Sequence, residues 1–312
     1  MPVMNRREFV ATNAVAIAGT RWLSLLQRQA AKGTRLILLG TGGGPRPRTN
    51  RVASAQAILV NDSAYVVDCG DGVARQCVAA GIALTKLRHI FITHQHSDHN
   101  ADYGNLVMAA WTVGLESRID TWGPPPLEKM TKLFFEMNAY DINIRIADEA
   151  KPPLVPLVHV HELTTSGTTL TDANVKVTST RVPHPPVEPA FAYRFDTADR
   201  SIVISGDTAP SDDLAKLAKG ADVLVHEAMY VPAIDRLAAR IPNATGLKQH
   251  ILASHTSAED AGRIAQAAGV KLLVLSHLVP ADDPTVTDDM WIKAAKTHFR
   301  GPVIVGKDLL EI

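Results

Sequence analysis

Short apolar runs, most of three to nine residues, alternate with polar turns along the chain from residue 34 onward. Runs of this length that are rich in Val and Ile and bounded by Gly, Asn, Asp or Pro are typical of β-strands. A strand pair with a turn at 61–63 has the pattern of a β-hairpin. Strands are expected at residues 34–39, 57–60, 64–67, 89–93, 155–163, 175–180, 190–195, 201–205, 223–225, 272–275 and 303–305.

Longer segments with helical spacing lie between these runs. Gly81 is a stop signal for the first of them, and Ser257 with Asp260 three residues later is close to a capping box at the start of the last. The segment 122–126, Trp-Gly-Pro-Pro-Pro, predicts a break. Helices are expected at residues 72–81, 106–115, 127–138, 211–219 and 257–268, so the pattern predicts a mixed α and β chain.

Four potential metal ligands follow directly after the apolar run at 90–92. They are His94, His96, Asp98 and His99. A regular strand or helix cannot aim all four side chains at one point, so the run predicts a turn at the end of a strand. Imidazole nitrogen and carboxylate oxygen suit zinc and neighbouring divalent ions. A polar turn with chance histidines is the alternative.

The same arrangement recurs further along the chain. Asp207 follows the apolar run at 202–204, and His277 follows the run at 272–275. Side chains that follow the carboxyl ends of strands share one edge of a sheet, so His94, Asp207 and His277 are expected to converge there.

At these residues the chain resembles the metallo-β-lactamase superfamily, whose His-x-His-x-Asp-His pattern matches His94 to His99. Other patches resemble the ribonuclease Z-like and arylsulfatase-like branch, in the same order along the chain. They are residues 39–45 with Arg51, 67–72, 204–208, 226–228, 255–257 and 275–277. The resemblance implies an α/β (α+β) fold, the four-layer αββα sandwich of that superfamily.

The resemblance also implies the ligand sets of a dinuclear site with two Zn²⁺, or Mn²⁺ or Fe²⁺, per chain. Two such ions share and activate a bridging hydroxide, so no serine or cysteine nucleophile is needed. One ion would take His94, His96 and His184, the other would take Asp98, His99 and His277, and Asp207 would bridge them. Asp98 is also expected in the catalytic set, and a surface loop histidine is the alternative for His184.

Three more residues take roles from the resemblance. Asp68 is expected to accept a hydrogen bond from a ligand histidine and to fix its tautomer, which is compatible with an Asp turn before Gly70. Glu227 and His255 are expected to form a catalytic pair in which the imidazole protonates the leaving group. A purely structural hydrogen-bonded pair is the alternative.

Two further pairs are less informative. His159 and His161 would share a face of a strand, where an additional metal site at an interface is one option and an exposed polar face the other. Cys69 and Cys77 are interpreted as buried thiols in preference to a disulfide.

The N-terminus has the features of an export signal. Arg6 and Arg7 precede Phe9 and a weakly apolar run at 11–19, a pattern that resembles twin-arginine signals. The run is too short for a stable membrane span. Residues 1–32 are therefore expected to be an export signal that leads to a periplasmic or secreted protein, and residues 33–312 a single metallo-hydrolase domain. An amphipathic helix that packs on the domain is the alternative.

The net charge and the number of residues between two proposed ligands bear on whether nucleic acid is expected as a partner. The chain has 32 basic and 32 acidic residues, and its net charge is +0, so no basic nucleic-acid footprint is visible. Only 22 residues separate His184 from Asp207, too few for the protruding arm that the ribonuclease Z resemblance would place there. Nucleic acid is therefore not expected as a partner, and a homodimer is left open.

The expected function is an exported zinc-dependent hydrolase that acts on a small-molecule ester, such as a phosphodiester or an aryl sulfate. The alternatives are a hydrolytic dehalogenase of activated chloroaromatics or a lactonase. A ribonuclease Z-type endonuclease ranks below these, and a non-enzymatic scaffold ranks last.

Overall fold

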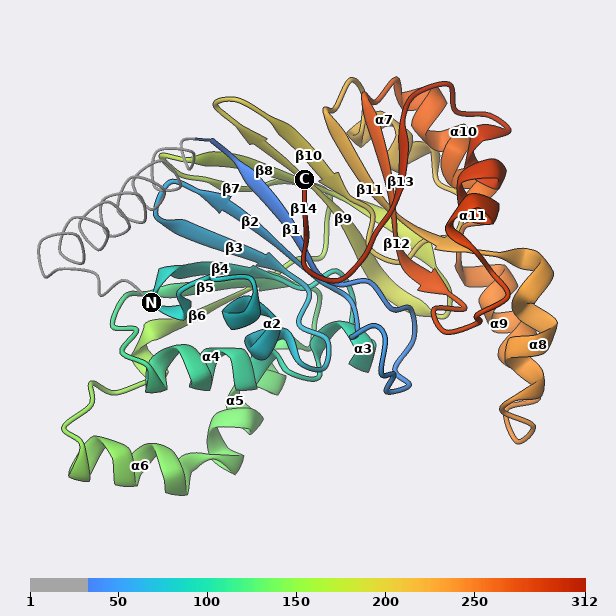
Figure 1. The fold of residues 1–312 in the computed structure, drawn as a ribbon. Coiled ribbons are helices and arrows are strands. Elements are labelled where there is room, and N and C mark those ends of the chain that lie inside the picture. Colours follow the sequence, from blue (N-terminus) through green and yellow to red (C-terminus); the bar gives the residue numbers. More distant parts are fainter. Residues whose placement is uncertain (1–32) are drawn as a thin grey trace, which may run out of the picture.

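The computed structural model describes residues 33–312, in which two seven-stranded sheets pack face to face with helices on their outer faces (Figure 1). This arrangement confirms the αββα sandwich. The export signal expected at residues 1–32 lies outside the described residues. Within residues 33–312, none of the helices combines the length and the apolar character that a membrane span requires.

The first sheet is built mainly from the N-terminal half of the described chain. Its strand order is β14-β1-β2-β3-β4-β5-β6, antiparallel from β14 to β3 and parallel from β3 to β6. The bounds are β1 Arg35–Gly40, β2 Ala55–Val60, β3 Ser63–Val67, β4 Leu87–Phe91, β5 Ile119–Gly123, β6 Val158–Glu162 and β14 Leu310–Glu311.

The second sheet comes from the C-terminal half. Its order is β13-β12-β11-β10-β9-β8-β7, with parallel pairing from β13 to β10 and antiparallel hairpins from β10 to β7. The bounds are β7 Gly167–Thr171, β8 Val175–His184, β9 Val187–Thr197, β10 Ser201–Ile204, β11 Val223–Met229, β12 Leu272–Val279 and β13 Val303–Val305.

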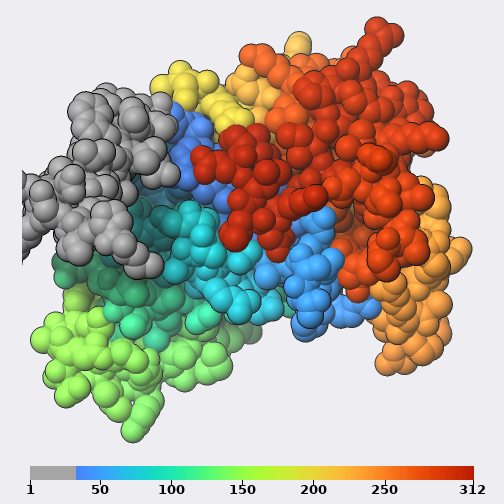
Figure 2. Space-filling model, viewed as in Figure 1, coloured from blue at the N-terminus to red at the C-terminus, as the bar shows by residue number. Residues whose placement is uncertain are grey.

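Helices cover the outer faces of both sheets, and two more, α8 and α9, lie at one end of the sandwich (Figure 1). In Figure 2, α6 in light green and α8 in orange form two separate lobes. The α-helices are α2 Val73–Ala79, α3 Ser97–Asn100, α4 Tyr103–Thr112, α5 Leu127–Met137, α6 Ala139–Asp148, α7 Asp212–Leu217, α8 Ile234–Ala239, α9 Leu247–Ser254, α10 Ala258–Ala268 and α11 Asp288–Lys296. Short 3₁₀ turns are η1 Leu84–Lys86, η2 Val155–Leu157 and η3 Val231–Ala233.

Three apolar clusters hold the layers together. One lies between the sheets and includes Leu36, Tyr65, Phe91 and Phe195, and the other two lie between each sheet and its helices. β11 and β12 are buried on both faces, so nearly every residue in them is buried. β8 lies toward the edge of its sheet, and its buried and exposed residues largely alternate.

Most expected elements are present, with longer strands than the apolar runs suggest. β8 extends to His184 and β11 to Met229, because hydrogen bonding to neighbouring strands continues past the apolar residues. The expected strand at 155–163 begins with the 3₁₀ turn η2, where Pro156 has no amide hydrogen to donate. β5, β7, β14, α3, α6, α8, α9 and α11 are additions to the sequence-based prediction.

Candidate metal centre

The metal-ligand run begins where β4 ends, as expected. His94 follows β4 in an extended loop, and α3 begins immediately after His96. The single turn of α3 carries Asp98 and His99, and both side chains are buried. A loop followed by one helical turn therefore turns four ligand-type side chains toward the same edge of the sandwich.

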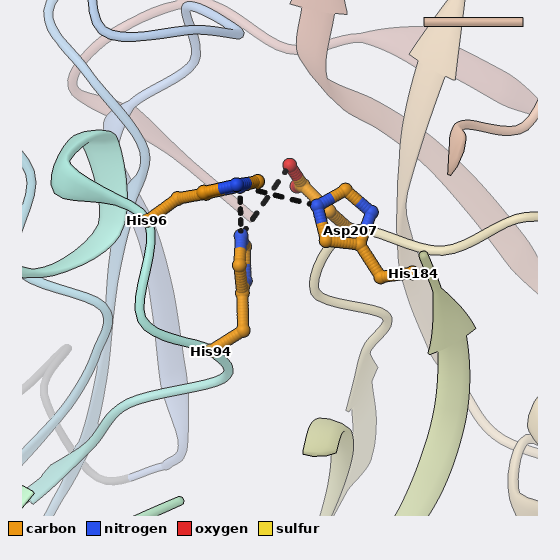
Figure 3. A group of neighbouring side chains, drawn as sticks. All are labelled: His94, His96, His184 and Asp207. Atoms are coloured by element: carbon orange, nitrogen blue, oxygen red, sulfur yellow. Dashed lines mark hydrogen bonds and ion pairs between the residues drawn. The ribbon is translucent and has the colours of Figure 1, made fainter. Parts of the chain in front are cut away.

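The first candidate group joins this loop to the second sheet (Figure 3). His94 Nε2 lies 3.0 Å from His96 Nδ1, and His96 Nδ1 lies 3.2 Å from His184 Nε2. Asp207 completes the group, with its Oδ2 3.8 Å from His94 Nε2. His184 is the last residue of β8 and is fully buried, so it is not a surface loop histidine.

The second candidate group consists of Asp98, His99, His277 and the same Asp207. Asp207 Oδ1 lies 3.3 Å from His99 Nε2, and its Oδ2 lies 3.2 Å from His277 Nε2. Asp98 Oδ2 lies 3.2 Å from His277 Nε2. One carboxylate therefore faces both groups, the position expected of a bridging ligand.

Local backbone geometry directs two of these side chains. His277 is unpaired at a register shift between β11 and β12, and its φ is 42°. Asp68, directly after β3, has a φ of 61°. A β-bulge re-aims a side chain out of the strand's alternation, and left-handed backbone in non-glycine residues is often found at functional sites.

The other ring nitrogens of two histidines are held by hydrogen bonds. His99 Nδ1 donates to Asp68 Oδ2 at 2.7 Å, and His184 Nδ1 donates to the carbonyl of Ser254 at 2.9 Å. Each bond fixes the tautomer in which Nε2 presents a lone pair to the site. Asp68 also accepts from the amide of Thr93, so it anchors the start of the metal-ligand run.

The electrostatics differ between the two groups. Burial lowers the pKa of His94 well below its usual range, and burial with the neighbouring His184 lowers the pKa of His96 to about 4. Burial opposes ionisation of Asp207, but the imidazoles of His277 and His99 outweigh it and hold the carboxyl pKa well below its usual range. In the second group, burial disfavours the charged imidazole of His99, but the carboxylates of Asp207, Asp68 and Asp98 outweigh it and raise the pKa of His99 well above its usual range. A divalent cation requires neutral imidazoles and ionised carboxylates, so binding of a cation there would release the proton of His99.

A cation fits this donor set. His99 Nε2 and Asp207 Oδ1 are buried and lie 3.3 Å apart, and neither forms a well-aligned hydrogen bond with any of the described residues. In the first group, imidazole nitrogens of low proton affinity face one another at 3.0–3.2 Å. Buried polar atoms without partners are costly, and a divalent ion with nitrogen and oxygen ligands would satisfy them.

Glu227 and His255 lie next to the second group. His255 Nδ1 lies 3.1 Å from Glu227 Oε1 and 3.2 Å from Oε2. Glu227 is fixed in turn by the amides of Thr208 and Thr256, at 3.0 and 3.1 Å. Burial disfavours the charged imidazole, but Glu227 outweighs burial and raises the pKa of His255 to about 9. The contact that the catalytic pair requires is therefore present.

Other sequence-based expectations can be placed. His159 is exposed, and His161 pairs with Asp120 at 2.7 Å; neither belongs to any candidate metal group within residues 33–312. Cys69 and Cys77 are buried free thiols, as expected. A pocket next to the site is lined by the loop after β1 and by α8–α9. Sequence analysis singled out residues 39–45 only as a family motif and expected no helices at α8 and α9. The i, i+4 spacing of Leu247 and Ile251 was the available signal for α9.

Comparison with known proteins agrees with this geometry. Residues 64–278 match the family model described as a beta-lactamase superfamily domain. The chain belongs to the metallo-β-lactamase superfamily. Within this superfamily, it is 32% identical over 277 residues to a Ribonuclease Z of Mycobacterium bovis, a match that covers 88% of this chain and 96% of the relative. This similarity places it in the ribonuclease Z branch.

Solved structures of the superfamily share the fold. The metallo-beta-lactamase fold protein YhfI from Bacillus subtilis has a TM-score of 0.66 at 23% identity, over 89% of this chain and 98% of that chain. Human tRNase Z, short form, has a TM-score of 0.64, also at 23% identity and with the same coverage. As a member of this superfamily, the chain is a metal-dependent hydrolase with a divalent metal cofactor.

The relatives overturn the expected activity and partners. The prediction of an exported hydrolase for a small-molecule ester, and its dehalogenase and lactonase alternatives, are wrong, because the curated relatives are ribonucleases Z. Exclusion of nucleic acid as a partner is wrong for the same reason. It rested on the short segment between His184 and Asp207, yet a chain of this size spans 96% of a ribonuclease Z. The missing arm is thus no argument against that activity.

The predicted periplasmic or secreted location is contradicted as well. It rested on the resemblance of the N-terminus to a twin-arginine signal, and the ribonuclease Z relatives point away from an exported protein. The paired arginines that suggested twin-arginine export, Arg6 and Arg7, lie outside the described residues. The neutral net charge was also a poor guide to nucleic-acid binding. It averages over the whole chain and says nothing of the local charge next to the site.

Proposed function

We propose that this chain is a ribonuclease Z-type endonuclease that hydrolyses a phosphodiester bond of RNA, with precursor tRNA as its substrate class. The observation that carries the proposal is 32% identity to a Ribonuclease Z over 96% of that relative. A structural neighbour is human tRNase Z, which supports the choice of tRNA. The contact between Glu227 and His255 beside the candidate metal groups supplies the acid that phosphodiester cleavage needs.

The proposed ligands form two sets around a shared carboxylate. His94, His96 and His184 would hold one ion, Asp98, His99 and His277 would hold the other, and Asp207 would bridge them. We propose zinc, since three imidazoles with a carboxylate are typical of zinc sites. Two divalent ions in such a site lower the pKa of a bound water and stabilise the charge that develops on the phosphate.

Side chains and a backbone carbonyl of the protein orient the ligand histidines, and one side chain gives a proton to the leaving group. Asp68 holds His99 through Nδ1, and Ser254 holds His184 through its carbonyl, so both rings keep their orientation during the reaction. Glu227 keeps His255 protonated and aimed beside the site. His255 is placed to give its proton to the departing ribose oxygen, a poor leaving group that gains most from general acid catalysis.

The proposal is tested with zinc-loaded protein and a precursor tRNA that carries a 3′ extension. The expected result is a single cut at the junction, abolished in Asp207→Ala. Asp212→Ala is the matched control, because Asp212 is an exposed carboxylate on the adjoining α7. Zinc-loaded, folded protein that leaves every RNA intact would overturn the proposal.

A further inference from the structure

A small closed chamber lies between the two sheets, on the inner side of the candidate metal centre. Its volume is about 10 Å³, which is the lower limit for one water molecule. Strands of both sheets contribute to its lining, and none of the lining side chains is more than 3% exposed. Polar contacts inside the chamber are therefore made without competition from bulk solvent.

Two polar side chains reach the chamber from opposite sheets. Gln56 is two residues before Ile58 on β2, and Ser276 is two residues after Val274 on β12. Ile58 and Val274 belong to the apolar cluster between the sheets. Because side chains alternate along a strand, Gln56 and Ser276 face this apolar layer from its two sides, at the end next to the metal centre.

Both side chains have a polar atom without a partner in the protein. Gln56 Oε1 and Ser276 Oγ are buried and form no hydrogen bond within residues 33–312. The side-chain amide nitrogen of Gln56 donates to Ser54 Oγ at 3.3 Å, so the carbonyl oxygen is the free end of this side chain. Buried polar groups are normally hydrogen-bonded, and internal water is a common partner. The chamber admits no larger partner.

The carboxylate of Asp207 also lines the chamber. Two further carboxylates do so, but they already have partners. Asp68 accepts hydrogen bonds from Thr93 and His99, and Glu227 accepts from two backbone amides and an imidazole. Asp207 is therefore the carboxylate with unused capacity on the side of the chamber.

A hydrogen bond from behind is also what a bridging ligand needs. Ligands of a metal ion are usually held by hydrogen bonds to groups further out, as Asp68 holds His99 and the carbonyl of Ser254 holds His184. The contacts of Asp207 within ion-pair distance, in the part of the chain described, are imidazoles of the site. A carboxylate oxygen has two lone pairs, so it can bind an ion with one and accept a hydrogen bond with the other.

We propose that the chamber holds one buried water molecule, which anchors the Asp207 carboxylate to Gln56 and Ser276. The water accepts a hydrogen bond from the Ser276 hydroxyl and donates its two hydrogens to Gln56 Oε1 and to Asp207. Gln56 and Ser276 are then positioning residues, since they act on the ions only through the water and Asp207. The inference rests on the proposed function only through the bridging role of Asp207, whichever substrate is cleaved.

A high-resolution crystal structure of the zinc-loaded wild type tests the water directly. We expect ordered density in the chamber, about 2.8 Å from both Gln56 Oε1 and Ser276 Oγ. A chamber without such density would overturn the proposal, whatever the activity on RNA.

Two variants test the anchoring role. Gln56→Leu removes the acceptor and keeps an apolar side chain of similar bulk, and Ser276→Ala removes the donor. Each should weaken zinc binding about tenfold, the usual scale for losing such a partner. Because both residues act through one water, the double variant should lose little more than either single variant. Ser179→Ala is the control, since Ser179 is equally buried on β8 and its hydroxyl instead accepts from Thr169 at 2.9 Å.

Zinc affinity is measured by competition with a chelator, with kcat and KM on precursor tRNA in parallel. At saturating zinc, kcat should fall and KM should stay near the wild-type value, because neither residue contacts RNA. Wild-type zinc affinity in both single variants, additive losses in the double variant, or an equal loss in Ser179→Ala would overturn the anchoring role. If the wild type binds zinc but leaves RNA intact, the proposed function fails, and the zinc affinities still decide on the anchor.

Discussion

Asp68 accepts a hydrogen bond of 2.7 Å from Nδ1 of His99, and both side chains are almost completely buried. The bond leaves Nε2 of His99 as the only ring nitrogen that can face Asp98 and Asp207. A carboxylate 31 residues away in the chain thus fixes the tautomer of a proposed ligand.

Asp68→Ala should weaken metal binding or activity about 10–100-fold, the usual effect of removing such a partner. The loss of metal binding is measured as zinc affinity in competition with a chelator, and the loss of activity is measured as kcat on RNA. Asp71→Ala is the control, because Asp71 is exposed in the same turn. Wild-type zinc affinity and kcat in Asp68→Ala would show that His99 keeps its orientation without the carboxylate.

Asp207→Ala should lower the zinc content from about two ions per chain and remove nearly all activity, because its carboxylate faces both candidate groups. Elemental analysis of folded protein, with Asp212→Ala alongside, measures the zinc content. A chelator should abolish activity in the wild type, and added zinc should restore it. Full zinc content in Asp207→Ala would contradict the bridging role.

His255→Ala should slow cleavage of RNA by about 10²–10⁴-fold, because the departing ribose oxygen needs a proton. The rate of cleavage of a p-nitrophenyl phosphodiester, used as a probe, should fall much less, since nitrophenolate leaves without a proton. Zinc content should stay unchanged. His298→Ala, an exposed histidine of no proposed role, is the control. Equal losses on both substrates would indicate that His255 positions the substrate and does not protonate it.

Asp222 should stabilise the fold against acid. Its carboxylate pairs with Lys271 at 2.6 Å and accepts from the Ser201 amide at 2.7 Å and from the Ser201 hydroxyl, which lowers its pKa to about 2. A depressed pKa contributes stability above the unfolded-state value near 4, and this contribution is lost as pH falls toward 2.

Asp222→Asn should therefore cost about 1 kcal/mol near pH 7, with allowance for solvent screening, and the deficit relative to wild type should shrink below about pH 4. Urea unfolding at several pH values measures this. Asp148→Asn, at an exposed position, should match the wild type throughout. A deficit that does not change with pH would show that the charge of Asp222 contributes nothing.

The sequence was most informative where an apolar run stops at a ligand. His94 and Asp207 were placed by that pattern, because a strand's end fixes the position of the next side chain, whereas His277 lies inside β12, which continues to Val279. The contact between Glu227 and His255 was not derivable, since the two residues are 28 positions apart and two helices lie between them. The bulge that directs His277 arises from pairing with β11 and has no signal in the sequence around His277.

There are also physical reasons why some strands and helices were not predicted from the sequence. Gly123 and the prolines after it concealed β5, whose burial comes from its neighbours β4 and β6. Pro232, Pro242 and Gly246 divide α8 and α9 into helices too short for a clear period. The function was misjudged because a short connection between His184 and Asp207 was weighed above the overall likeness to ribonuclease Z.

The proposed ligands come from both layers of the sandwich. His94 to His99 follow a strand of the first sheet, whereas His184 and His277 lie on strands of the second sheet and Asp207 follows another of its strands. Ions held between these ligands would cross-link the two sheets, so separating the sheets during unfolding would also require breaking coordination bonds. Metal loading would then raise the melting temperature as well as switch on catalysis. A chain cut in the turn between β6 and β7 would need zinc to reassemble.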